Sequence, residues 1–157
     1  IVKNTDNQDM YFSVGAHPAF NCPINAGESY SDCYLEFSER ETLSTSPLTP
    51  DGLVKNESIP VLKDSNILPL TDHLFDNDAL IFRNLKSRCV TLRSHKSDTA
   101  VAVEFPDFNY LGIWAKPQAP FVCIEPWLGV ADSVDSDGLI EHKEAIIKLP
   151  AGEKFAE

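Results

Sequence analysis

Glu125 is the residue whose surroundings best prepare it for proton transfer. It lies in an almost wholly apolar run at positions 121–127, FVCIEPW, which ends what reads as a buried strand. A carboxylate held away from water has a raised pKa, which suits a general acid or base. Side chains alternate along a strand, so Glu125 should share its face with Phe121, Cys123 and Trp127. The alternative is a carboxylate at a strand end that turns out to solvent.

His17 is the second candidate, in a stretch where every other residue is apolar. The opposite face carries His17 among small or polar residues, namely Ser13, Gly15, Ala19 and Asn21. Pro18 disfavours the helical region for His17 and so holds it extended. A surface imidazole on the wet side of a strand is the simpler reading. Glycine and alanine, however, leave room for a ligand to dock against His17.

Composition restricts the class of partner. The 157 residues suit one domain, 1–157, with ordinary proportions of hydrophobic (43%) and charged (24%) residues. A formal net charge of −11 argues against nucleic acid or an anionic membrane as partner. The sequence contains no cluster of Arg and Lys and no glycine-rich phosphate loop, which weakens the case for a phosphorylated substrate. A neutral or cationic small ligand is favoured.

The cysteines show no spacing typical of a metal site. Cys22, Cys33, Cys89 and Cys123 form neither a CxxC pair nor a Cys/His ligand pattern, so no metal is expected. We expect four free thiols and, with no evident signal peptide or membrane-spanning run, a cytoplasmic protein.

Strand-like segments recur between turn signals, and helical signal is weak. Extended segments are expected over residues 10–20, 33–43, 79–82, 88–93, 99–105, 110–115, 121–125 and 145–149. Residues 44–70 contain four prolines and are expected to be irregular with short edge strands, and Thr71 could cap one short turn. Many short strands separated by Pro and Gly turns predict an all-β, antiparallel β-sandwich or barrel.

Three motifs carry a resemblance to a known family. They are GAHPAFN at 15–21, NDALIF at 77–82 and FVCIEPW at 121–127, the last followed by GVADS at 129–133. Together with YLGIWAKP at 110–117, they resemble the aldose 1-epimerase (mutarotase) family, most closely its branch associated with lactose-utilisation operons. The resemblance runs over essentially the whole chain.

The resemblance implies a galactose mutarotase-like supersandwich, a sugar ligand such as the aldohexoses galactose or glucose, and no cofactor. Glu125 matches the family's catalytic base, His17 its histidine acid, and Asp78 an aspartate that holds sugar hydroxyls. Family members are considerably longer, and their N-terminal part adds a histidine and an arginine to the cleft. The chain therefore looks like the C-terminal portion of the fold, without its N-terminal part.

Two tryptophans fit a sugar site. Trp114 and Trp127 offer flat apolar faces to the C–H edges of a sugar, although both could equally fill the core. The leading interpretation is an aldose 1-epimerase, with a non-catalytic carbohydrate-binding protein of the same fold as the alternative. A glycosidase using Glu125 and Asp78 as paired carboxylates and a purely structural fragment remain open.

Overall fold

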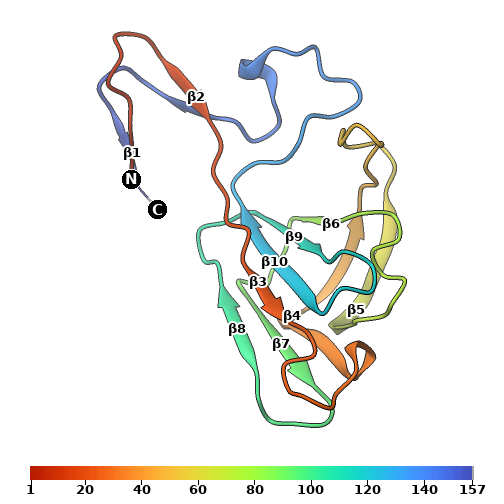
Figure 1. Cartoon of the computed structure of the whole chain (residues 1–157). Helices are drawn as coiled ribbons and strands as arrows, with labels where there is room; N and C mark the ends of the chain where they lie inside the picture. The colour runs from red at the N-terminus through yellow and green to blue at the C-terminus, as the bar shows by residue number, and fades with distance from the viewer. Residues whose placement is uncertain (157) are drawn as a thin grey trace.

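Two four-stranded antiparallel sheets face each other in the computed structural model, which describes residues 1–156 (Figure 1). The first sheet has the order β3-β10-β9-β6, from β3 (Ala19–Asn21), β10 (Phe121–Trp127), β9 (Tyr110–Trp114) and β6 (Leu80–Arg83). The second has the order β5-β4-β7-β8, from β5 (Ile59–Pro69), β4 (Cys33–Thr45), β7 (Cys89–Ser94) and β8 (Val101–Glu104). The predicted antiparallel β-sandwich is confirmed.

The core lies between these two sheets. Alternate residues of β10 and β9, such as Ile124 and Ile113, are buried in the same apolar cluster as Leu35, Phe37 and Leu92 of the second sheet. Because strand side chains alternate, the remaining residues of β10 and β9 lie on the other face of the first sheet. That outer face carries the candidate site.

Two short ribbons lie outside the sandwich and bring the two ends of the chain together (Figure 1). β1 (Val2–Lys3) pairs with β12 (Lys154–Phe155), and β2 (Met10–Phe12) pairs with β11 (Ile147–Leu149). Asn4 is buried between them and donates hydrogen bonds to the carbonyl oxygens of Gln8 and Leu149. No helix of the described residues is long and apolar enough to cross a membrane.

The strand expected over residues 10–20 is wrong as a single element. β2 pairs with β11, whereas β3 pairs with β10, so the chain leaves one partner for another between Phe12 and Ala19. Pairing with different partners overrides the continuous alternation in the sequence. Val14, predicted on the apolar face, is exposed as a result.

The expectation of an irregular excursion with short edge strands over residues 44–70 is only partly right, because the edge strand is long. β5 forms an 11-residue strand within this region and pairs along β4. It lies at the edge of its sheet, where a proline removes no hydrogen bond that a second neighbour would need, so Pro60 and Pro69 are tolerated. The other expected strands are confirmed to within a few residues. Two 3₁₀ turns, η1 (Tyr30–Asp32) and η2 (Ile140–His142), were not predicted.

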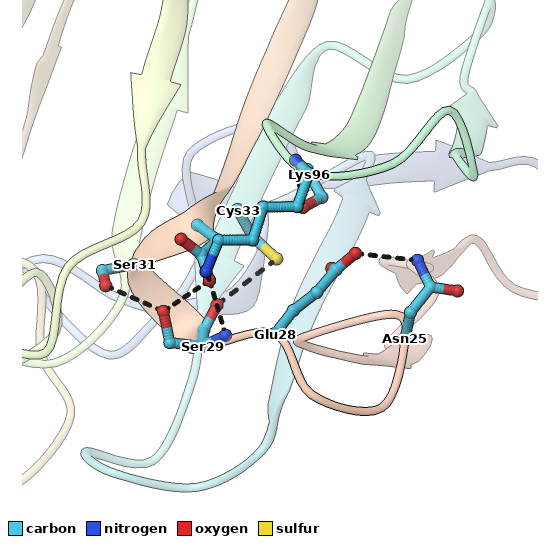
Figure 2. A network of polar contacts seen from close by, with 8 residues as sticks. Asn25, Glu28, Ser29, Ser31, Cys33 and Lys96 are labelled. Carbon is cyan, nitrogen blue, oxygen red and sulfur yellow. Dashed lines mark hydrogen bonds and ion pairs between the residues drawn. The ribbon is translucent and has the colours of Figure 1, made fainter.

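A polar network fixes the loop that follows β3 (Figure 2). Asp32 Oδ2 accepts hydrogen bonds from Ser29 N (2.7 Å) and Ser29 Oγ (2.6 Å), and pairs with Lys96 Nζ at 2.7 Å. Asn25 donates to Glu28 at 3.1 Å and to Ser97 at 2.7 Å. The loop is thereby tied to the β7–β8 hairpin, which holds the end of β3 in place.

Candidate active site

The register of the first sheet sets which residues share its outer face. Cys123 lies opposite Ala19 on one side and Trp114 on the other, and Glu125 lies opposite Gly112. Gly112 in turn lies opposite Ile81 of β6. The predicted face with Phe121, Cys123, Glu125 and Trp127 therefore exists, and β9 adds Trp114 and Gly112 to it.

His17 reaches this face because the chain before β3 continues alongside β10. Ile124 N donates to the Pro18 carbonyl at 3.2 Å, and Ala16 N donates to the Pro126 carbonyl at 2.9 Å. These bonds flank His17 and hold it beside Glu125. Its Nε2 lies 3.3 Å from Glu125 Oε1. The two candidates, more than a hundred positions apart in the sequence, thus form a direct pair.

The two members of the pair differ sharply in exposure. The Glu125 side chain is 5% exposed, whereas the His17 side chain is 65% exposed. Glu125 is therefore not a strand-end carboxylate that turns out to solvent. Burial raises the pKa of the Glu125 carboxyl, while nearby His17 and the side chains of Trp127 and Cys123 act to lower that pKa. A carboxyl with a raised pKa, touching an accessible imidazole, is suited to proton transfer.

Trp127 lies across the face between two glycines. A β-carbon on Gly15 would lie 2.6 Å from Cδ1 of the indole, and one on Gly112 would overlap with its Cζ2 and Cη2. Gly15 and Trp127 also form an isolated antiparallel bridge. Both glycines are therefore needed to let the indole lie flat beside Glu125. Trp127 is partly buried against the small cluster of Val54, Ile81 and Val130.

Trp114 lies at the other side of the pair. Its ring meets the His17 imidazole edge-on, with centroids 6.4 Å apart and an interplanar angle of 82°. It also contacts Phe121, with ring centroids 5.8 Å apart. Trp114 is therefore on the outer face and not in the main core. Its contact with the imidazole restricts the position of His17.

Asp78 makes only a local contact. Asp78 lies two residues before Leu80, the first residue of β6, which pairs with Ile113. Its φ of 76° is in the left-handed region. Its Oδ1 accepts a hydrogen bond from Ala79 N at 2.7 Å. It is exposed. The acidic partner of His17 is Glu125.

A pocket of about 390 Å³, wide open to solvent, lies beside His17. Its walls come from two segments, residues 13–17 and 127–131, and include Ser13, His17, Trp127 and Val130. The wall residues after Trp127 were not predicted individually from the sequence. The available signal was the GVADS stretch, which begins at Gly129, one residue beyond the end of FVCIEPW.

The sequence of this chain matches a family of known proteins. A family model described as aldose 1-epimerase matches residues 1–138. The chain belongs to the aldose 1-epimerase family. Protein LacX of Lactococcus lactis subsp. lactis, in plasmid and chromosomal forms, is 41% identical over 143 residues, which are 89% of this chain and 48% of the relative.

Solved structures of aldose 1-epimerase relatives have the same fold. A galactose mutarotase related enzyme from Lactobacillus acidophilus superposes with a TM-score of 0.87 at 37% identity, over 98% of this chain and 52% of that one. A galactose mutarotase-like protein from Lactobacillus casei gives 0.84 at 30% identity, over 96% and 53%. The chain thus spans about half the length of the relatives it matches, and its fold is galactose mutarotase-like.

Proposed function

We propose that the protein acts as an aldose 1-epimerase, interconverting the α and β anomers of an aldohexose such as galactose or glucose. The observation that carries this proposal is the contact between the exposed imidazole of His17 and the buried carboxyl of Glu125, 3.3 Å apart. Membership of the aldose 1-epimerase family and the mutarotase-like neighbours support it.

The reaction needs one base and one acid. Glu125 takes the proton of the anomeric hydroxyl as C1 becomes a carbonyl and the bond from C1 to the ring oxygen breaks. Protonated His17 gives its proton to the ring oxygen. Rotation about the C1–C2 bond presents the other face of the aldehyde, and ring closure returns both protons. A positioned acid–base pair of this kind contributes roughly 10²–10⁴-fold in rate.

The surroundings of the pair suit a sugar. The cavity beside His17 is about 390 Å³, and a sugar in it would contact Trp127. Trp114, whose ring edge contacts His17, is the second proposed aromatic contact. Asp78 is proposed to bind sugar hydroxyls, since its second carboxylate oxygen has no hydrogen bond among the described residues. The proposal includes a cytoplasmic setting, supported by four free thiols.

Binding without turnover is the second candidate. The side chains that hold a sugar hydroxyl, such as the exposed carboxylate of Asp78, can bind a sugar without turning it over. A glycosidase is disfavoured because it needs two carboxylates about the scissile bond, and the partner of Glu125 is an imidazole.

Polarimetry separates these candidates. Pure α-D-galactose or α-D-glucose is dissolved with and without the protein, and the spontaneous rate is subtracted. An epimerase accelerates the approach to the same final rotation. Sugar binding measured by calorimetry without any acceleration would instead support the non-catalytic candidate.

A further inference from the structure

Three different ligand-type atoms converge at the acid–base pair. Cys123 is on the same strand and the same face as Glu125, two residues earlier. His17, Cys123 and Glu125 each offer one atom, and these atoms all lie within 4.8 Å of one another. Cys123 and Glu125 are buried, whereas His17 is open to solvent. The sequence did not reveal this set, because its third member comes from a separate part of the chain.

The spacing fits a tetrahedral ion. Bonds of about 2.0–2.3 Å to nitrogen, oxygen and sulfur place neighbouring ligand atoms about 3.3–3.7 Å apart in a tetrahedron. The distance of 3.3 Å between His17 Nε2 and Glu125 Oε1 matches such an edge. The Cys123 sulfur lies within 4.8 Å of the other two atoms, so each of these distances must shorten by at most about 1.5 Å to complete a third corner.

The chemical types of the three ligand atoms indicate which metal ion would bind. Thiolate, imidazole and carboxylate together are typical of Zn²⁺, while Mg²⁺ and Ca²⁺ prefer oxygen ligands alone. Three protein ligands with one open position are typical of accessible zinc sites. The open position would face the cavity that His17 lines. The formal net charge of −11 also favours a cation.

We propose that the protein binds one Zn²⁺ ion through His17 Nε2, Cys123 Sγ and a carboxylate oxygen of Glu125. On binding, the Cys123 thiol loses its proton to solvent and the ion bonds to the resulting thiolate. The ion then occupies the lone pairs that Glu125 and His17 need for proton transfer. If the proposed epimerase function holds, zinc is therefore an inhibitor of this protein.

Cobalt provides a probe of binding that is independent of turnover. Co²⁺ is added to the protein, and the near-ultraviolet charge-transfer band from thiolate to cobalt is followed. Zn²⁺ is then added to displace the bound Co²⁺. We expect one ion per chain. Cys123→Ser should abolish the band and weaken Zn²⁺ binding at least about 100-fold. Replacing even a residue that only hydrogen-bonds to a metal ligand typically lowers metal affinity by about 10–100-fold. Cys89→Ser, at a half-buried thiol on β7, is the matched control and should keep the band.

His17→Asn guards against misfolding of the buried Cys123 variant. His17 is exposed, so its replacement should leave the fold intact and still weaken Zn²⁺ binding at least about 100-fold. His73→Asn, at an 86% exposed histidine, should not. No band in the wild type, or equal Zn²⁺ affinity in wild type and His17→Asn, would overturn the metal site. A normal band with no epimerase activity would overturn only the proposed function, and activity without a band only the metal site.

Discussion

The indole of Trp127 lies directly over Gly112, so that a β-carbon at position 112 would overlap with Cζ2 and Cη2 of the ring. Gly112 is also the residue opposite Glu125 in the sheet. The absence of a side chain on β9 therefore creates the space in which Trp127 lies flat beside the candidate base. Glycine is needed at position 112 because the Trp127 ring occupies the space of a side chain, and not because the backbone turns there.

Gly112→Ala should displace Trp127. Overpacking of this kind costs about 1–3 kcal/mol in the free energy of unfolding, measured by urea denaturation, and should shift the tryptophan fluorescence. Trp127→Phe removes the ring atoms that conflict with the new methyl group. Gly112→Ala should therefore cost less in the Trp127→Phe background, and equal costs in both backgrounds would show that the indole is not the obstacle.

Glu41 is a buried carboxylate with a structural role. It is 2% exposed, and its Oε1 accepts hydrogen bonds from Lys86 N at 2.9 Å and Ser87 N at 2.7 Å. Glu41→Ala leaves the buried Ser87 N and the partly buried Lys86 N without this partner, which should cost about 1–3 kcal/mol of stability. Glu39→Ala, at an exposed position of the same strand, should change stability by less than about 0.5 kcal/mol. Urea unfolding of the two variants side by side measures the difference.

His142 should titrate above an ordinary histidine. Its Nδ1 lies 2.7 Å from Asp137 Oδ2, and the hydrogen bond to Asp137, followed by its charge, raises the pKa of His142. Glu141 acts in the same direction, and partial desolvation opposes it. Because the folded pKa is raised, the pair stabilises the fold fully below the unfolded pKa of histidine. That contribution is lost as pH rises through the folded pKa.

Proton NMR of the histidine ring resonances tests this directly. The wild-type midpoint should lie above that of a histidine in an unfolded peptide, and Asp137→Asn should bring it down. A midpoint unchanged by Asp137→Asn would contradict the assigned cause.

Much of the fold followed from alternation and turn residues. Tyr110 to Trp114 and Phe121 onward were predicted as strands because both are short apolar runs bounded by a Pro-rich turn. β5 was expected only as short edge strands, because Pro60 and Pro69 suggest irregular chain, and its full length follows only from its pairing along β4. The number of partners that a strand will have is not encoded locally.

The candidate site also has features that the sequence predicts and features that depend on how the strands pair. The shared face of Cys123 and Glu125 follows from a period of two and was predicted. The contact of His17 with Glu125 depends on the pairing of the chain around Pro18 with β10, which no local pattern specifies. The roles of Gly15 and Gly112 depend on where the Trp127 ring lies, so these roles could not be predicted from the sequence.

The most direct test of the proposed chemistry is the rate of anomer interconversion in Glu125→Gln. The amide keeps the size of the carboxyl and an accepting oxygen but cannot take the anomeric proton. Glu104→Gln, at an exposed glutamate of β8 in the other sheet, is the matched control. Polarimetry from a pure anomer should show the catalysed rate fall by about 10²–10⁴-fold in Glu125→Gln and remain unchanged in Glu104→Gln. A Glu125→Gln protein that turns over at the wild-type rate would contradict the assignment of Glu125 as the base.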